Sequence, residues 1–365
     1  MNSPTFPRKG RGAVSNPAGR FEKVRAEAVD DGWEREEPLP PFETHVSPEP
    51  ARTIISHNDS PDIPFEQSIN PYRGCEHGCV YCFARPTHAY LNLSPGLDFE
   101  TRLFFKPQAA ELLEKELARK NYRVVPIALG TNTDPYQPIE RRLKVTRSIL
   151  EVLWRCRHPC TIVTKGTLIE RDLDLLVPMA EANLVSVMVS VTTLDDALKR
   201  VMEPRTPSPA ARLQTIERLA AARIPVGALI APVIPAINDH EIERLVAAVA
   251  AHGASSAGYV MLRLPNELKE LFREWLTTHF PLKAEHVMAL IRDLRGGKAN
   301  DPRFGTRMTG EGELANLLRS RFKLAARRAG LNEERRKDLD CAAFQSPQGR
   351  GRADGRPATP QLTLF

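Results

Sequence analysis

The stretch NPYRGCEHGCVYCFARPTH, residues 70–88, places three cysteines within eight residues, at Cys75, Cys79 and Cys82. This Cys-x3-Cys-x2-Cys spacing indicates a metal or redox site rather than a disulfide framework, because the chain shows no export signal. Thiolates are soft ligands that select zinc, copper or iron–sulfur clusters. Structural zinc and an iron–sulfur cube each normally take four protein ligands, so three thiols on one loop leave a metal position open for chemistry. The sequence therefore favours an iron–sulfur cluster, with a zinc site near His77 and a metal-free loop as alternatives.

Short apolar runs alternate along the chain with segments of helical spacing. We expect strands over Gln67–Tyr72, Tyr122–Leu129, Thr161–Thr164, Leu184–Val191, Pro225–Pro232 and Tyr259–Leu264. We expect helices over Pro107–Lys120, Glu140–Trp154, Glu170–Ala182, Leu194–Val201, His240–His252 and Asn266–Thr277. This alternation predicts parallel strands in an α/β barrel or a doubly wound sheet. In such folds the chemistry lies at the carboxyl ends of the strands, and the cysteines directly follow the first strand.

The cysteine spacing, with Tyr81 just before the last cysteine, resembles the signature of the radical S-adenosylmethionine (SAM) superfamily. The resemblance implies a 4Fe–4S cluster held by Cys75, Cys79 and Cys82, whose remaining iron binds SAM. It also implies reductive cleavage of SAM to a 5′-deoxyadenosyl radical, with an electron donor as partner. The expected fold is a partial (βα)6 TIM-like barrel, and the resemblance covers about residues 66–265.

The segment LGTNTDPYQPIE, residues 129–140, resembles the turn of the spore photoproduct lyase branch of this superfamily. That resemblance implies that Thr133 and Asp134 lie at the methionine part of SAM, and that Lys165 pairs with its carboxylate. Ser190 and Arg205 would by the same resemblance face the ribose or the carboxylate. The expected cofactor-binding residues are Tyr81, Thr133, Asp134, Lys165, Ser190 and Arg205. The alternatives are ordinary turn residues and surface charges.

The lyase branch carries a hydrogen-donating cysteine in this turn, where the present chain has Thr131 and Asn132. A repair mechanism that depends on that cysteine is therefore not carried over. Cys156 and Cys160 are expected as small buried apolar residues, with a second cluster or a radical relay as the alternative. The pattern assigns no role to Cys341.

Four regions are expected along the chain: a disordered or extended tail over 1–50, a radical SAM core over 51–265, a helical extension over 266–332, and a disordered basic tail over 333–365. The tails are rich in proline or charge and lack apolar periodicity. The longest uncharged apolar run, Ile224–Ile237, contains three prolines and is shorter than the about 20 residues of a membrane span. With no secretory apolar segment at the N-terminus, the expected location is the cytoplasm.

The formal net charge of +6 and the pI near 9.0 allow an anionic partner. A predicted helix over Gly312–Ala329 carries Arg319, Lys323 and Arg327 at four-residue spacing, as either a nucleic-acid surface or a solvated helix face. We therefore expect a radical SAM enzyme whose substrate is a DNA base or lesion, in DNA repair. The alternatives are modification of RNA, a peptide or a small molecule, and a nucleic-acid-binding protein with a structural cluster.

The last five residues, QLTLF, resemble the pentapeptide by which bacterial polymerases and repair proteins bind the replicative sliding clamp. Leu364 and Phe365 would form the apolar pair that fills a pocket on the clamp, and Gln361 would anchor the peptide, with Leu362 between them. A chance apolar terminus is the alternative. The resemblance predicts a sliding clamp as a partner.

Overall fold

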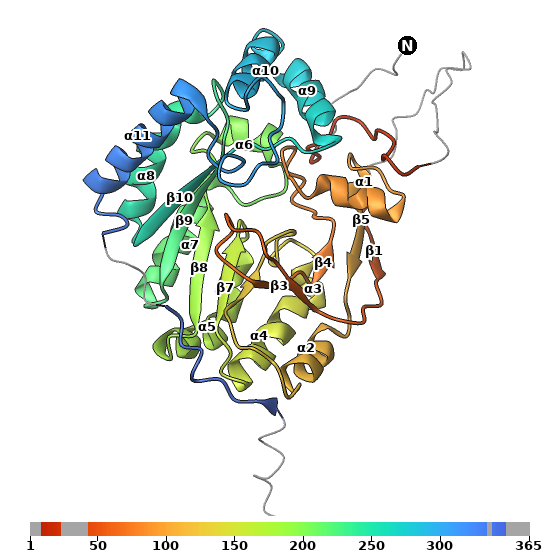
Figure 1. Cartoon of the computed structure of the whole chain (residues 1–365), viewed down its shortest axis with the longest axis vertical. Helices are drawn as coiled ribbons and strands as arrows, with labels where there is room; N and C mark the ends of the chain where they lie inside the picture. The colour runs from red at the N-terminus through yellow and green to blue at the C-terminus, as the bar shows by residue number, and fades with distance from the viewer. Residues whose placement is uncertain (1–8, 23–42, 334–337, 348–365) are drawn as a thin grey trace, which may run out of the picture.

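The main sheet has seven strands in the order β10-β9-β8-β7-β6-β3-β2, and six of them run parallel (Figure 1). The computed structural model describes residues 9–22, 43–333 and 338–347. The parallel strands are β3 (Gln67–Ile69), β6 (Ile127–Leu129), β7 (Cys160–Thr164), β8 (Val185–Ser190), β9 (Val226–Val233) and β10 (Ser256–Met261). The edge strand β2 (Ile55–His57) pairs antiparallel with β3. The expected α/β architecture with a parallel sheet is confirmed.

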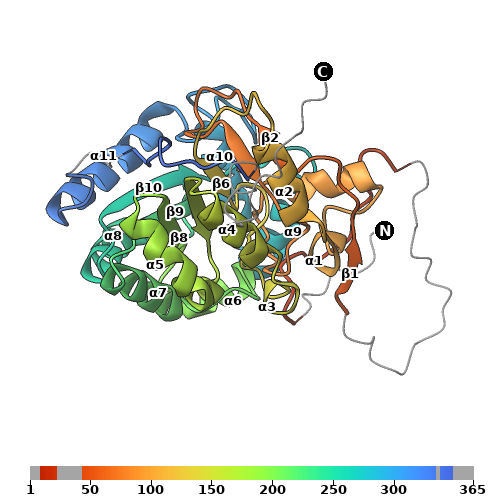
Figure 2. The same ribbon diagram turned by 90° about the horizontal axis from the view of Figure 1, so that it is seen from below.

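Helices cover the convex face of this curved sheet (Figure 2). They are α2 (Ala109–Leu117), α4 (Val145–Arg155), α5 (Leu173–Glu181), α7 (Pro209–Ala221) and α8 (Ile242–Ala251). Shorter pieces are α3 (Glu140–Leu143), α6 (Asp196–Met202) and the 3-10 turns η2 (Thr167–Asp172) and η3 (Asp239–Glu241). Strands β3, β6, β8 and β9 are buried over most of their length on both faces, which explains why β6, β8 and β9 read as continuous apolar runs rather than as alternating patterns.

Several element boundaries differ from the expected ones. The run Tyr122–Leu129 forms a strand only from Ile127, because Pro126 has no N–H to donate to a neighbouring strand. The last strand begins at Ser256, three residues before the expected start. Helix α7 was not predicted, although Ser208 caps its first turn and Pro209 begins it, a common start signal.

A small second sheet lies directly before the cysteine loop, residues 74–82. It consists of β1 (His45–Pro48), β5 (Arg102–Phe105) and β4 (Tyr72–Arg73), in that order, with α1 (Asp98–Thr101) before β5. Strand β4 ends two residues before Cys75. The right side of Figure 1 shows this sheet beside the barrel. Strand β1 and residues 9–22 belong to the stretch expected as a disordered or extended tail, and both are fixed in place on the folded body.

The C-terminal extension contains α9 (Leu268–His279), α10 (Ala284–Asp293) and α11 (Gly312–Arg328). Helix α10 was not predicted. Helices α9 and α10 form an apolar cluster with Cys79, Val80 and Tyr81, so the extension packs directly on the cysteine loop. Helix α11 packs on α8 through its buried face.

Residues 338–347 also lie on the folded body, within the stretch expected as a disordered basic tail. The ring of Phe344 lies 5.8 Å from that of Tyr122 and 5.4 Å from that of His158, and the N–H of Gln345 donates to the carbonyl of Cys156. The expected clamp-binding residues, 361–365, lie outside the described residues, and the four-region division stays a prediction. In the part of the chain that the structure describes, no helix is long and apolar enough to cross a bilayer.

A buried ion pair between Arg85 and Glu100 holds the cysteine loop against α1. Arg85 begins the 3-10 turn η1 (Arg85–Leu91) and is fully buried. Its guanidinium also donates to the carbonyls of Gly78 (3.1 Å) and Cys79 (2.8 Å), which lie inside the loop. On its other side, Glu100 accepts hydrogen bonds from the backbone N–H groups of residues 12 and 13, at 3.0 and 2.8 Å. One carboxylate therefore joins the N-terminal segment, α1 and the loop.

The change Glu100→Gln should lower the free energy of unfolding by about 3–5 kcal/mol, because it leaves the buried Arg85 charge without a counter-ion. Urea unfolding of the metal-free protein measures this. The matched control is Glu243→Gln, which breaks the partly exposed pair with Arg321 and should cost less than about 1 kcal/mol. Equal effects of the two changes would contradict the assigned role of Glu100.

Candidate functional site

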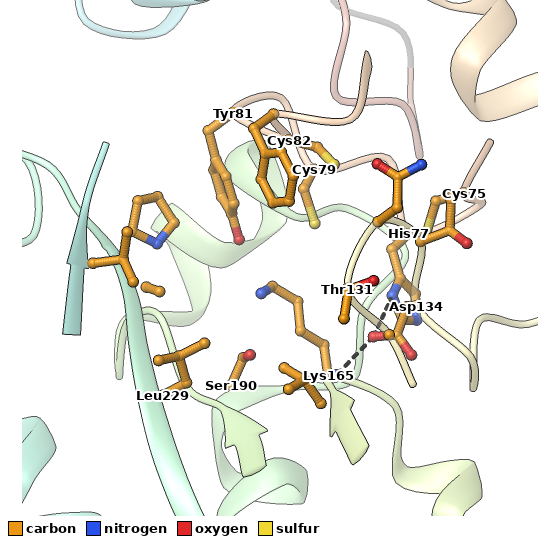
Figure 3. A pocket seen from close by; sticks show the side chains of 18 of the residues that line it. Cys75, His77, Cys79, Tyr81, Cys82, Thr131, Asp134, Lys165, Ser190 and Leu229 are labelled. Carbon is orange, nitrogen blue, oxygen red and sulfur yellow. Dashed lines mark hydrogen bonds and ion pairs between the residues drawn. The ribbon is translucent and has the colours of Figure 1, made fainter. Parts of the chain in front are cut away.

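One pocket opens at the carboxyl ends of the parallel strands (Figure 3). All three clustered cysteines line it, together with the residues that follow β6, β7 and β10 and with residues of β8 and β9. The lining residues include Cys75, Cys79, Cys82, Tyr81, Thr131, Asn132, Thr133, Asp134, Lys165, Ser190, Leu229, Pro232 and Arg263. This is the end of the sheet at which α/β barrels carry their chemistry.

Backbone contacts fix the course of the cysteine loop. The N–H of Cys75 donates to the carbonyl of Phe99 (3.0 Å), and the N–H of Val80 donates to the carbonyl of Met202 (3.1 Å). Gly74 and Gly78 have φ values of 72° and 67°, which L-residues rarely adopt. A Cβ at Gly78 would lie 2.7 Å from a carboxylate oxygen of Glu100. The glycine before each of the first two cysteines is therefore required by the loop's conformation.

The three thiols line one pocket without converging on a single point. In the described chain, no three or more His, Cys, Asp or Glu side chains are grouped to hold one ion. Zinc would require such convergence, with sulfur about 2.3 Å from the metal, whereas a cluster binds each thiolate through a different iron. Burial raises the pKa of Cys79 to about 12 and that of Cys75 well above its usual value, so the thiols alone are neutral. Binding to iron would displace their protons.

Asp134 is held by hydrogen bonds from within the protein. Its carboxylate accepts from the hydroxyl of Thr164 (2.6 Å) and from the N–H groups of Lys165 (2.7 Å) and Tyr136 (2.9 Å), and His77 Nδ1 lies 3.4 Å away. Burial opposes ionisation, but the charge of His77 and these donors outweigh it and lower the pKa of Asp134 to about 2. Asp134 therefore links the turn after β6 to the end of β7.

The hydroxyl of Thr133 is likewise used within the protein, since it donates to the carbonyl of Tyr72 (3.0 Å). Asn70, just before the cysteine loop, accepts from the N–H of Asn132 (2.9 Å). The turn and the loop are thus tied to each other, and both line the pocket. Asn70 was not singled out from the sequence, although it opens the quoted stretch.

The side chain of Lys165 extends into the pocket toward the cysteine loop, as Figure 3 shows. Its Nζ lies 5.8 Å from the centre of the Tyr81 ring and 4.0 Å from a carboxylate oxygen of Glu203. Glu203 is fully buried; it accepts hydrogen bonds from the hydroxyls of Tyr81 and Thr192 and forms an ion pair with Arg212. Burial alone would raise the pKa of Glu203, but Arg212 and Lys165 outweigh it and lower the pKa to about 2.

The structure therefore gathers Tyr81, Thr133, Asp134, Lys165 and Ser190 around one pocket. Arg205 is the exception among the expected cofactor-binding residues. Its guanidinium lies 3.0 Å from Glu76, and it lines a neighbouring hollow rather than this pocket.

Sequence reasoning missed Glu203 and Arg212, whose pairing across nine residues has no local pattern to reveal it. It also missed Arg263, which follows β10 by two residues and lines the pocket. The basic residues of α11 lie elsewhere, on the outside of the barrel beside α8. Of these, Lys323 and Arg327 are exposed, and Arg319 is half-buried.

The radical SAM superfamily model matches residues 69–249. An uncharacterized protein of Mycobacterium tuberculosis, Rv2578c, is 41% identical over 232 residues, which are 63% of this chain and 68% of that protein. An uncharacterized protein of Methanocaldococcus jannaschii, MJ0683, is 30% identical over 174 residues, which are 47% of this chain and 62% of that protein.

Among solved structures, spore photoproduct lyase complexed with dinucleoside spore photoproduct has a similar fold, with a TM-score of 0.58 and 16% identity. The match covers 78% of this chain and 80% of the lyase chain. At this identity the likeness concerns the fold alone. The family match, the barrel and the three cysteines at its catalytic end lead to one conclusion: the chain belongs to the radical SAM superfamily and is an enzyme.

Proposed function

We propose that Cys75, Cys79 and Cys82 hold a 4Fe–4S cluster and that the enzyme cleaves SAM reductively beside it. When reduced, such a cluster supplies the single electron that converts SAM to methionine and a 5′-deoxyadenosyl radical. The observation that carries the proposal is the shared pocket, where three thiols and the cation of Lys165 face one cavity. The family itself implies SAM and an iron–sulfur cluster.

The charges around the pocket suit the carboxylate of SAM. Glu203 carries one negative charge and lies near two cations, Arg212 and Lys165. Arg212 forms the closer ion pair with Glu203, so this single carboxylate balances the charge of Lys165 only in part. We assign Lys165 to the methionine carboxylate. Asp134 and Thr133 act at the methionine end through the turn that they hold, since their own polar atoms already have partners in the protein.

The remaining expected residues take supporting roles. Tyr81 is anchored by Glu203 and presents its ring beside Lys165, which gives that cation an apolar wall. Ser190, at the end of β8, brings a hydroxyl to the pocket for the ribose. Arg205 acts indirectly, through its ion pair with Glu76 and the bond from its N–H to the carbonyl of His77 in the cysteine loop.

Replacing Cys75, Cys79 or Cys82 singly by alanine should remove iron and abolish formation of 5′-deoxyadenosine, because no neighbouring thiol replaces the missing ligand. The protein is purified anaerobically, iron and sulfide are assayed, and the product is measured after dithionite reduction with SAM. Cys341→Ala, outside the pocket, is the matched control and should keep both. Full iron content and full product in all three pocket variants would refute the assignment.

Lys165→Ala should weaken SAM binding by about 1.5–3 kcal/mol, the range for a hydrogen bond to a charged group. Iron content should not change. Equilibrium binding of SAM to the iron-loaded enzyme measures this. Lys199→Ala is the matched control, since Lys199 also feels the charge of Glu203 but donates to the carbonyl of Pro204 and does not line the pocket. If both variants bind SAM like the wild type, Lys165 is not its carboxylate ligand.

We further propose a DNA base or lesion as the substrate. Spore photoproduct lyase, which has a similar fold, has been solved in complex with dinucleoside spore photoproduct. The exposed cations of α11 offer a surface for the phosphate backbone. The chain has Thr131 and Asn132 in the turn after β6, so the hydrogen-donating cysteine of the lyase branch has no counterpart there. RNA, a peptide or a small molecule are the alternative substrates.

Arg319, Lys323 and Arg327 are changed together to glutamine, and binding of duplex DNA is measured as a function of salt. The slope of the logarithm of the binding constant against the logarithm of the salt concentration should become smaller by about 0.9 for each phosphate contact that is lost. Anisotropy titrations at several salt concentrations measure the slope. Arg321→Gln, on the same helix but paired with Glu243, is the control and should leave the slope unchanged. Salt-independent binding by the wild type would contradict a DNA substrate and favour a peptide or a small molecule.

A further inference from the structure

Arg263 is an arginine whose donors are largely unused. Its Nε is buried without a hydrogen-bond partner, and its Nη1 reaches only the sulfur of Met308, at 3.8 Å. No carboxylate forms an ion pair with it in the part of the chain that the structure describes. Arg263 is half-buried, and a buried N–H of a guanidinium without an acceptor is unfavourable. Because Arg263 lines the pocket, a molecule that enters there can supply the acceptor.

The neighbouring arginines do not share this property. Arg295 donates to four backbone carbonyls, those of Met261, Leu262, Thr306 and Arg307. Arg307 forms an ion pair with Asp62. Of these three cations, Arg263 therefore remains available for an anion.

One aromatic ring, that of Phe83, lies beside this cation at the pocket. The guanidinium of Arg263 lies 5.6 Å from the centre of the Phe83 ring, and Phe83 is nevertheless 46% exposed. A second pair follows, with Arg307 4.7 Å from the centre of the Phe304 ring, itself 56% exposed. The N–H of Met261 donates to the carbonyl of Met308, which joins the segment carrying the second pair to the end of β10.

An exposed ring beside an arginine that has no carboxylate partner matches the chemistry of a single nucleic-acid strand. The aromatic face of Phe83 can stack on a base, and Arg263 can bind the neighbouring phosphate. An acidic peptide would use the cation but would gain nothing from the rings. The carboxylate of SAM is the other anion expected here, but we assign it to Lys165, which directly follows the central strand β7. Arg263 follows β10, an edge strand three positions away from β7 in the sheet.

We propose that Arg263 and Phe83 form a nucleotide subsite at the mouth of the pocket, in which Phe83 stacks on a base of a single strand or an extruded base and Arg263 binds its phosphate. The subsite deepens the proposed function, on which it rests. It differs from the α11 surface, because it lies at the pocket itself. Phe83 directly follows Cys82, so the stacked nucleotide would lie next to the cysteine loop.

The test measures binding of a fluorescein-labelled oligothymidylate of about 12 nucleotides to the iron-loaded enzyme with SAM. Arg263→Gln should weaken binding about tenfold or more and lower the salt slope by about 0.7, the value for one phosphate on a single strand. Phe83→Leu should weaken binding at least about fivefold with an unchanged salt slope, because stacking releases no counter-ion. Arg218→Gln, which breaks an ion pair with Glu170, is the control and should bind like the wild type.

Three results would overturn the subsite. These are unchanged oligonucleotide binding in both variants, a loss of SAM affinity rather than oligonucleotide affinity in Arg263→Gln, and equally tight binding of a hexaglutamate peptide with the same dependence on Arg263. Formation of 5′-deoxyadenosine by the wild type is measured separately. If the wild type cleaves SAM while both variants bind normally, only the subsite fails. If no SAM is cleaved while binding depends on Arg263 and Phe83, only the proposed function fails.

Discussion

The carboxylate of Glu100 is the contact on which the cysteine loop depends. It faces Arg85 from one side and the N–H groups of Gly12 and Ala13 from the other, and Arg85 passes the constraint to the loop carbonyls of Gly78 and Cys79. A buried charge is stable only when it has partners, so this one carboxylate fixes the cysteine loop and α1 to the N-terminal segment, which is more than 80 residues away from Glu100 in sequence. The approach is close, since a Cβ on Gly12 would overlap the carbonyl oxygen of Gly78. These contacts fix the course of the cysteine loop through protein groups alone.

Two further buried carboxylates, Asp134 and Glu203, organise the pocket by different means. Asp134 is stabilised by His77 and by hydrogen bonds from Thr164 and the backbone, whereas Glu203 is stabilised by Arg212, Lys165 and the hydroxyl of Tyr81. Both have a pKa of about 2, below the unfolded value, so each stabilises the fold above about pH 4 and loses that contribution only as the pH falls toward 2. Their charges are constant at neutral pH. Lys165 therefore meets a bound anion in a pocket whose carboxylate charges do not change near neutral pH.

The local features were readable from the sequence, and the long-range ones were not. The cysteine spacing and the apolar runs predicted the loop, the parallel strands and the end of the sheet at which the pocket lies, because each signal is contained within a few residues. Pro126 shortened one strand, and the helix after Ser208 was missed although its start signal was present. Glu100 and Glu203 gave no signal, since the partners of a buried carboxylate are set by tertiary packing. Arg205 was placed at the pocket by resemblance, but its carboxylate partner draws it outside.

Residues 338–347 pack on the end of the barrel that lies opposite to the pocket. Asp340 donates its N–H to the carbonyl of Asn183, just before β8, and Gln345 bonds to Cys156, just after α4, so this segment runs along the amino-terminal end of the barrel. The pocket opens at the carboxyl ends of the same strands. The described chain therefore ends, at Pro347, on the pole opposite to the catalytic mouth. Residues 338–347 therefore cover the amino-terminal end of the barrel, and the carboxyl ends of the strands are left to line the pocket.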